Sequence, residues 1–371
     1  ASSRRPIGRR KMSRTAVSLA LNAALALLVL GAVVLRRNIY YDKAPTNLAA
    51  GVAARAGMRT GRMRTLVKGM PKFPQRTVQA RSSVELTTCV DLEDTKYSDP
   101  DQQRRFAQHK SENNQRVLNI DAVYDPSSLK GKVVMVTGAN RGLGNAIAKE
   151  LAAVGAKIIA ANRSPGMELE GDLKDATLQV IDGIDVTNDA SLEKLIKDLG
   201  DQKVDVLINN AGYFLKDPET IDNLNFPEEL KMIDICALGP LRVAAALVNA
   251  GLMESGGKIV TISSQGGSIA WREVQNQGGP YDYGHHMSKC AANMMTRLLA
   301  MEMKEKGITV VALHPGFNRT KMTEKYKHIW DIEGAVDPSI GAKRVIHETA
   351  ILKPERSGVF INCEDGLEIP W

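Results

Sequence analysis

The sequence predicts an α/β fold, a Rossmann-type doubly wound parallel sheet, preceded by one N-terminal transmembrane helix. Three observations predict this arrangement. Short β-branched runs alternate with helical patterns from Lys132 to the end of the chain. A glycine-rich loop joins the first of these runs to the first helical pattern. An uncharged apolar segment lies near the N-terminus, well separated from this alternating region.

The apolar segment runs from Thr15 to Leu35 and carries no charged side chain. At about 1.5 Å of rise per residue, a helix of this length spans roughly 30 Å, the thickness of a bilayer core. A cleavable signal peptide is the alternative, but the segment ends in Val-Val-Leu followed by Arg36 and Arg37, which is typical of a stop rather than a cleavage site. We expect a retained transmembrane helix, with its orientation left open by the basic residues on both flanks.

The positive charge of the chain belongs to its N-terminal part. Residues 1–81 hold 17 Lys and Arg against one acidic residue, Asp42, whereas residues 82–371 hold 32 Lys and Arg against 41 Asp and Glu. This distribution argues against nucleic-acid binding and favours contact with anionic lipid or an acidic partner. An organellar membrane is expected, either the plastid thylakoid or the mitochondrial inner membrane, because loss of a targeting peptide would leave a chain that starts with Ala; the ER membrane is the alternative.

Four parts of the chain are predicted from these patterns. Residues 1–14 form a basic N-terminal segment and residues 15–35 the transmembrane helix. Residues 36–128 form an arm or linker, basic and then mixed in charge, whose stretch 36–81 would meet protein partners and whose last part packs on the edge of the domain. Residues 129–371 form the dinucleotide-binding domain. The four cysteines are scattered, so neither a metal site nor a disulfide framework is predicted.

Within the domain, the cofactor would bind where the first strand meets the first helix. Seven strands are expected, at 132–136, 156–161, 178–182, 204–208, 258–263, 309–313 and 358–362. The loop after the first strand supplies the residues that would approach a pyrophosphate at the helix N-terminus: Thr137, Gly138, Asn140, Arg141, Gly142, Leu143 and Gly144.

The second strand indicates which dinucleotide is bound. NAD enzymes place an acid at the end of this strand to bind the ribose 2′-hydroxyl. Here the strand ends in Asn162 and Arg163, and Arg141 lies in the glycine loop. Two guanidinium groups suit a 2′-phosphate, because arginine offers a bidentate fork. The cofactor prediction is therefore NADP(H), against the alternative of two solvated surface arginines.

Further motifs follow in a fixed order along the chain. Asp185-Val186 follows the third strand, Asn209-Asn210-Ala211-Gly212 the fourth, and a PGxxxT pattern runs from Pro315 to Thr320. This order resembles the short-chain dehydrogenase/reductase family across residues 131–371, and the closing segment 357–371 resembles its C-factor-like carbonyl reductase branch.

The resemblance implies roles for these residues in holding the cofactor. Asp185 and Val186 would meet the adenine, and Asn209 would stabilise the central strand beside the cofactor. The remaining positions implied to contact the dinucleotide are Ala211, Gly212, Lys289, Pro315, Gly316 and Thr320.

The resemblance also implies a catalytic set of serine, tyrosine, lysine and asparagine. Ser264 and Lys289 match the serine and the lysine. His285 stands four residues before the lysine, where the family has its tyrosine, and Cys236 stands at the asparagine position. Tyr283 lies six residues before Lys289, roughly 240° around a helix, and would face away from it.

Three interpretations of the histidine remain open. His285 could act as the acid, although the charge of Lys289 disfavours its protonated form. A bend after Gly278-Gly279-Pro280 could instead bring Tyr283 or Tyr281 into the site. Otherwise the domain no longer catalyses a reaction.

Two functions follow from these interpretations. The leading one is a membrane-anchored NADP(H)-binding protein, catalytically silent, that serves as an accessory or structural subunit of a respiratory or photosynthetic complex. The alternative is an active NADPH-dependent carbonyl reductase acting on a lipophilic substrate. The resemblance further implies that a homodimer could form through the helices that carry Leu230–Val248 and His285–Met303.

Overall fold

A computed structural model describes residues 96–165, 178–277 and 279–371. By its internal contacts the chain divides into two units, Ala1–Glu85 and Leu86–Trp371, and all described residues belong to the second. The predicted transmembrane helix Thr15–Leu35 and the basic stretch 36–81 lie outside the described residues. Among the described residues, one helical run, Phe226–Asn249, is long and apolar enough to cross a membrane, but half of its apolar window is buried inside the domain.

The domain is built on a seven-stranded sheet in the order β3-β2-β1-β4-β5-β6-β7, and every neighbouring pair is parallel. The strands are β1 (Val133–Thr137), β2 (Lys157–Asn162), β3 (Leu178–Asp182), β4 (Val206–Asn209), β5 (Lys258–Ile262), β6 (Thr309–His314) and β7 (Phe360–Asn362). The predicted doubly wound sheet is confirmed, with most strand ends displaced by one or two residues. The strand order reverses between β1 and β4, which is where such sheets bind dinucleotides.

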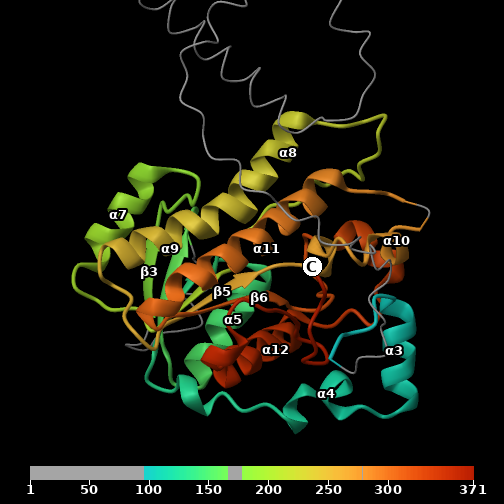
Figure 1. Ribbon diagram of the computed structural model, residues 1–371, viewed down its shortest axis with the longest axis horizontal. Coiled ribbons are helices and arrows are strands. Elements are labelled where there is room, and N and C mark those ends of the chain that lie inside the picture. Colours follow the sequence, from blue (N-terminus) through green and yellow to red (C-terminus); the bar gives the residue numbers. More distant parts are fainter. Residues whose placement is uncertain (1–95, 166–177, 278) are drawn as a thin grey trace, which may run out of the picture. The chain divides into compact units, whose positions relative to one another are not determined.

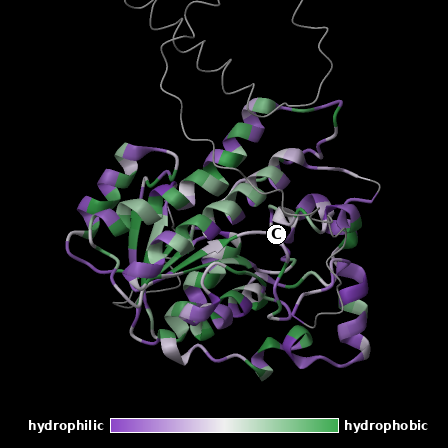
Figure 2. Cartoon of the chain, in the orientation of Figure 1, coloured by the Kyte–Doolittle hydropathy of each residue, from purple (hydrophilic) through white to green (hydrophobic). Residues whose placement is uncertain are grey.

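Helices cover both faces of the sheet (Figure 1). On one face lie α5 (Gly142–Ala153) and α12 (Pro338–Ile351), whose apolar side chains pack against β1 and β6. The other face is covered by α7 (Asp189–Leu199), α9 (Gly239–Asn249) and α11 (Tyr283–Met303). Because both faces are covered, the strands are almost continuously apolar, as Figure 2 shows.

Shorter elements connect these layers. α8 (Phe226–Ile233) runs through the π-helical turn η3 (Asp234–Leu238) into α9. The others are η4 (Gln265–Gly267), α10 (Arg272–Gln275), η5 (Lys304–Lys306), η6 (Glu324–Ile329) and η7 (Pro354–Arg356).

Residues 96–128 fold against the domain. They form α3 (Gln102–Ser111), α4 (Gln115–Leu118), η1 (Ile120–Ala122) and η2 (Ser127–Leu129). These residues were expected to belong to an arm or linker, and the structure gives them short helices and a bridge between Tyr97 and Glu368. Local caps explain the two helices, because the side chains of Asp101 and Asn114 accept hydrogen bonds from the first turns of α3 and α4.

Candidate functional site

The glycine loop between β1 and α5 comes close to the backbone of the neighbouring turn after β4. A Cβ atom on Gly144 would lie 2.3 Å from the carbonyl oxygen of Gly138, and one on Gly138 would lie 3.1 Å from Cα of Ala211. Gly138 and Gly142 also have positive φ angles, 66° and 56°. Glycine is therefore required here by close approach and by backbone conformation, as a loop that cradles a pyrophosphate requires.

Asn210 fastens this loop to the turn after β4. Its Nδ2 donates to the carbonyl oxygens of Thr137 and Gly138, at 3.0 and 3.1 Å, and Thr137 Oγ1 accepts from the amides of Asn210 and Ala211 at 3.0 Å each. Asn209, implied by the resemblance to stabilise the central strand beside the cofactor, donates from its Nδ2 to the carbonyl of Pro240 in α9 at 3.4 Å. Both asparagines lie in the predicted motif, but Asn210 holds the cofactor loop.

The two arginines predicted to bind a 2′-phosphate are both exposed on the edge of the site. Arg141 is the N-cap residue of α5, and Arg163 follows the end of β2. Burial would raise the pKa of Asp185, but hydrogen bonds from Thr187 and the charge of Arg163 lower it overall. Arg163 and Asp185 therefore lie at the same edge, whereas Val186 is buried with its side chain against Gly239.

The loop after β6 returns to the glycine loop. Gly316 has a φ of 84°, and a Cβ atom on Gly142 would lie 3.8 Å from Cγ2 of Thr320. A Cβ atom on Gly212 would lie 3.9 Å from Met322 in the same loop. The structure thus gathers the predicted cofactor residues of the β1, β4 and β6 loops around the switch point of the sheet.

The serine and the lysine come from β5 and α11. Ser264 follows the end of β5 and its Oγ accepts from the amide of Gly266 at 3.1 Å. Lys289 is buried, and its Nζ donates to the carbonyl of Ile262 at 2.9 Å, two residues before Ser264. A Cβ atom on Gly266 would lie 3.2 Å from Ser264 Oγ and 3.3 Å from Cδ2 of His285. Ser264, His285 and Lys289 are therefore brought to one place.

The imidazole of His285 lies against an aromatic ring. It stacks on Phe214, with centroids 4.2 Å apart and planes 23° from parallel, and its Nδ1 is buried without a hydrogen-bond partner. Burial lowers the pKa of His285 well below its usual range, and the charge of Lys289 adds to this shift. The charged imidazolium form of His285 is therefore disfavoured at neutral pH.

Comparisons with known proteins agree with this geometry. The family model for short chain dehydrogenases matches residues 132–329. The chain belongs to the short-chain dehydrogenase family. Nicotinamide dinucleotides are the cofactors of this family, so the cofactor class predicted from the glycine loop is confirmed at family level.

Individual relatives agree with this assignment. The chain is 31% identical over 242 residues to 1-hydroxy-2-glutathionyl-2-methyl-3-butene dehydrogenase of Rhodococcus sp. (strain AD45), covering 64% of this chain and 99% of the relative. It is 34% identical over 168 residues to the C-signal protein of Myxococcus xanthus, covering 45% and 93%. The domain is also similar to the NADPH-bound carbonyl reductase from chicken fatty liver, with 27% identity, a TM-score of 0.56, and coverage of 66% and 100%.

The helix geometry does not bring Tyr283 to the position of the tyrosine that the family resemblance implies. α11 is continuous from Tyr283, its first residue, so the bend that would carry Tyr283 toward Lys289 is absent from this helix. The ring of Tyr283 lies 6.2 Å from that of Tyr281, whose side chain is exposed. The proposal of Tyr283 as a substitute acid is therefore not supported by the geometry of the helix.

Cys236 also takes up different contacts from those of an asparagine that supports a water chain. It lies in η3, and its Sγ accepts from the amide of Tyr213 at 3.4 Å and donates to the carbonyl of the same residue at 3.5 Å. The thiol thus holds the backbone that leads to Phe214, the residue stacked on His285.

Three residues that were not predicted from the sequence, Asp282, Lys325 and Tyr326, lie around Phe214, the ring that stacks on His285. Nζ of Lys325 lies 3.8 Å from the ring centroid of Phe214 and 3.1 Å from Asp282 Oδ1. Tyr326 donates to the other oxygen of Asp282. Asp282 has a φ of 41°, unusual for a residue other than glycine. No periodicity marks these positions, although Asp282 directly precedes the catalytic helix.

Proposed function

We propose that this chain is a membrane-anchored, NADP(H)-binding member of the short-chain dehydrogenase family that does not reduce carbonyls at neutral pH. The observation that carries the proposal is the environment of His285, which is held neutral under Phe214 and beside Lys289. A family member reduces a carbonyl with a tyrosine that donates a proton, and a neutral imidazole is a far weaker acid. The cofactor would supply the hydride, and this chain's residues would bind it without completing the reaction.

NADP(H) binding is supported by the loops around the switch point. Gly138, Gly142 and Gly144 form the close turn between β1 and the N-terminus of α5, where a pyrophosphate would bind. The exposed side chains of Arg141 and Arg163 suit the 2′-phosphate. On the nicotinamide side, Thr320 lies beside Gly142, where the PGxxxT loop would hold that end of the cofactor.

The test is to titrate the full chain with NADPH and then to follow NADPH oxidation with a panel of aldehydes, ketones and quinones. The proposal expects saturable binding and no turnover above the uncatalysed rate. Turnover that disappears in Lys289→Ala would overturn the proposal of silence. Absence of NADPH binding would overturn the cofactor assignment.

We further propose that Thr15–Leu35 anchors the domain in an organellar membrane, as an accessory or structural subunit of a respiratory or photosynthetic complex. The uncharged segment and the basic stretch 36–81 support this part of the proposal. The chain should resist extraction from isolated organelle membranes by alkaline carbonate and should migrate with a larger assembly on a native gel. Release by carbonate would contradict the anchor, and migration at the size of the chain alone would contradict the complex.

A second function is favoured by one observation. Ser264 and Lys289 are both in place beside the cofactor loops, which an NADPH-dependent carbonyl reductase acting on a lipophilic substrate also requires. His285 would then have to act through its neutral form. Lys289→Ala separates the two functions, because only an active reductase has an activity to lose.

A homodimer is also proposed for the domain. The helices α8 and α11 expose large apolar side chains, among them Phe226, Leu230, Met294, Leu298 and Met301. Such a surface is typical of an interface. Analytical ultracentrifugation of the full chain in detergent would detect the dimer, and Met294→Glu should disrupt it.

A further inference from the structure

The polar helix α3 is tied to the domain at a buried ion-pair cluster. Figure 2 shows α3 as largely hydrophilic, yet Arg105 is only 2% exposed. Its guanidinium donates to Glu364 Oε2 at 3.0 Å, and Arg344 lies 3.5 Å from Glu364 Oε1. Burial alone would raise the pKa of Glu364, but Arg105 and Arg344 lower it to about 2. Polar contacts, rather than an apolar face, therefore fix α3.

The cluster lies directly beneath the loop that would hold the nicotinamide end of the cofactor. A Cβ atom on Gly316 would lie 2.8 Å from Cγ of Glu364 and 2.9 Å from Nη1 of Arg344. Oε1 of Glu364 also accepts from the amide of Phe317 at 3.4 Å. The backbone of the Pro315–Thr320 loop thus rests on the carboxylate that Arg105 holds.

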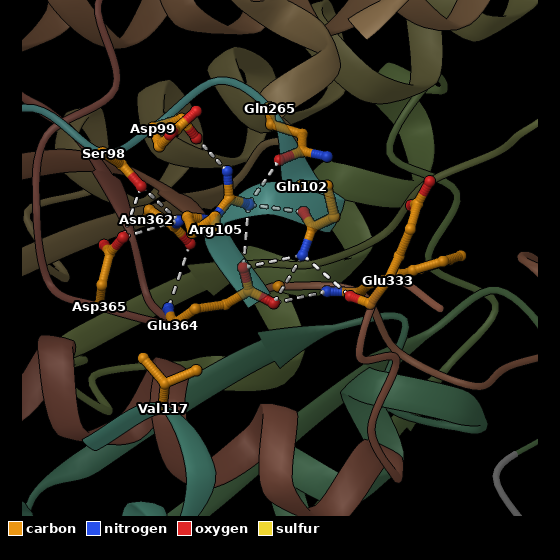
Figure 3. Close-up of polar contacts among 12 residues, drawn as sticks. Ser98, Asp99, Gln102, Arg105, Val117, Gln265, Glu333, Asn362, Glu364 and Asp365 are labelled. Atoms are coloured by element: carbon orange, nitrogen blue, oxygen red, sulfur yellow. Dashed lines mark hydrogen bonds and ion pairs between the residues drawn. The ribbon is translucent and has the colours of Figure 1, made fainter. Parts of the chain in front are cut away.

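The same guanidinium reaches the turn of the catalytic serine. Nη2 of Arg105 donates to Oε1 of Gln265 at 3.0 Å, and Gln265 directly follows Ser264 (Figure 3). The guanidinium also lies 5.7 Å from the ring centroid of Trp271. Arg105 therefore contacts both Glu364, which supports the Gly316 loop, and Gln265, which lies in the turn after Ser264.

Gln102 and Phe106, on the same helix, extend this contact to the end of the loop after β6. Nε2 of Gln102 donates to the carbonyl of Glu333 at 3.2 Å. A Cβ atom on Gly334 would lie 2.4 Å from the ring of Phe106, so the ring fits only against glycine. Both ends of the loop after β6 are thus held by α3.

We propose that residues 96–111 are part of the cofactor site, with Arg105 as a positioning residue for the Gly316 loop and the Ser264 turn. These residues precede the segment 132–329 that matches the family model. The inference rests on the proposed function, because it concerns the affinity for NADP(H). A loop that is already held in its binding conformation costs less free energy to order when the cofactor binds, so loss of a support is measurable as affinity.

Substitution of Arg105 tests this role against a neighbour on the same helix. In the full chain, Arg105→Met should weaken NADPH binding by at least about tenfold. Arg104→Met, which removes an exposed arginine paired with Asp99, is the matched control and should leave the affinity within about twofold. Arg105→Lys should restore part of the affinity because it keeps the charge. Equal NADPH affinity in Arg105→Met and Arg104→Met, with both folded, would overturn the inference.

A measurement on the unsubstituted chain covers the case in which Arg105→Met fails to fold. Because coupling between two sites is reciprocal, NADPH should slow amide hydrogen exchange in residues 102–111 as well as in residues 316–320. Protection of the loop without any change in α3 would overturn the inference.

NADPH binding by the full chain distinguishes failure of the proposed function from failure of this inference. If the full chain binds no NADPH, the proposed function fails by itself. The positioning role is then judged by amide exchange at Phe317 without ligand, which should be faster in Arg105→Met than in Arg104→Met because only the first substitution removes a cation from Glu364. Equal exchange in the two would contradict the positioning role.

Discussion

The two halves of the domain depart from the short-chain dehydrogenase pattern to different extents. In the cofactor half, the glycine loop, the turn with Asn210 and the PGxxxT loop meet at distances that only glycine permits. In the catalytic half, His285 and Cys236 stand where the family resemblance implies the tyrosine and the asparagine, and Ser264 and Lys289 stand at the implied serine and lysine positions. The proposed function therefore predicts that dinucleotide binding and proton transfer are separable in this chain, because they depend on different loops.

The histidine also differs from the tyrosine in its response to Lys289. A cation stabilises a developing phenolate and so makes tyrosine a better acid, whereas the same cation opposes an imidazolium. Burial is the main cause of the low pKa of His285, and the lysine that would assist a tyrosine lowers this pKa further. With histidine in place of tyrosine at position 285, the charge of Lys289 therefore opposes the proton-donating form instead of assisting it.

The largest effect is expected in the glycine loop. Gly144→Ala would place Cβ 2.3 Å from the Gly138 carbonyl and from Nδ2 of Asn210, so it should weaken NADPH binding by at least about 100-fold. Ala153→Gln, at the exposed last residue of α5, should leave binding unchanged. Binding is measured by quenching of intrinsic fluorescence. Unchanged binding in Gly144→Ala would show that the cofactor half is not the binding half.

Acid titration should show the next largest effect. His314 precedes the PGxxxT loop, and burial lowers its pKa to about 4. Below pH 6.5 the unfolded chain takes up a proton that the folded chain refuses, so stability is fully present above pH 6.5 and is lost as the pH falls toward 4. This contribution amounts to at most about 3 kcal/mol.

The variant His314→Gln should flatten the pH dependence of the free energy of unfolding between pH 6.5 and 4. Urea unfolding at a series of pH values measures it. An unchanged slope would mean that other groups, such as those around His285 in the catalytic half, determine the acid response.

The arginine pair sharpens the comparison within the cofactor half. Arg141→Ala/Arg163→Ala should weaken NADPH binding about 30-fold, roughly 2 kcal/mol, because two charge-assisted contacts to the 2′-phosphate are removed. NADH, which lacks this phosphate, is the internal control and should bind the variant and the parent equally. A parallel loss for NADH would assign the arginines to the pyrophosphate or to the loop itself.

Cys236 should have the smallest effect. In a background where activity has been restored by His285→Tyr, Cys236→Asn should raise kcat about threefold to tenfold, because proton transfer through an ordered chain contributes only part of general acid catalysis. Stopped-flow NADPH oxidation measures this change. A fall in kcat would mean that the thiol contacts to Tyr213 are needed to place Phe214.

Much of this organisation could be predicted from the sequence. The β-branched runs gave strands within two residues of their positions, because buried parallel strands are apolar on both faces. The glycine spacing identified the cofactor loop. The spacing of four residues in the sequence between His285 and Lys289 identified His285 as the residue at the implied tyrosine position. These patterns are local, because each depends on residues within one turn or one strand.

The parts that were missed depend on contacts between distant segments. Arg105 and Glu364 are 259 residues apart, so no periodicity connects them, and α3 lies in a stretch of mixed charge that was expected to be an arm or linker. Asn209 and Asn210 are adjacent, and the motif does not reveal which side chain turns toward the glycine loop. Lys325 and Asp282 form an ion pair, but they are 43 residues apart and belong to different segments of the chain.

The proposed function depends on a domain that binds NADPH and lacks the proton donor. The most direct test is NADPH oxidation by His285→Tyr in the full chain with the carbonyl panel, beside His286→Tyr as the matched control. A phenol would keep an aromatic ring against Phe214 and gain the help of Lys289, so His285→Tyr should turn over at least about 100-fold faster than the parent and His286→Tyr should not. Equal rates in the parent and His285→Tyr, with both binding NADPH, would contradict the claim.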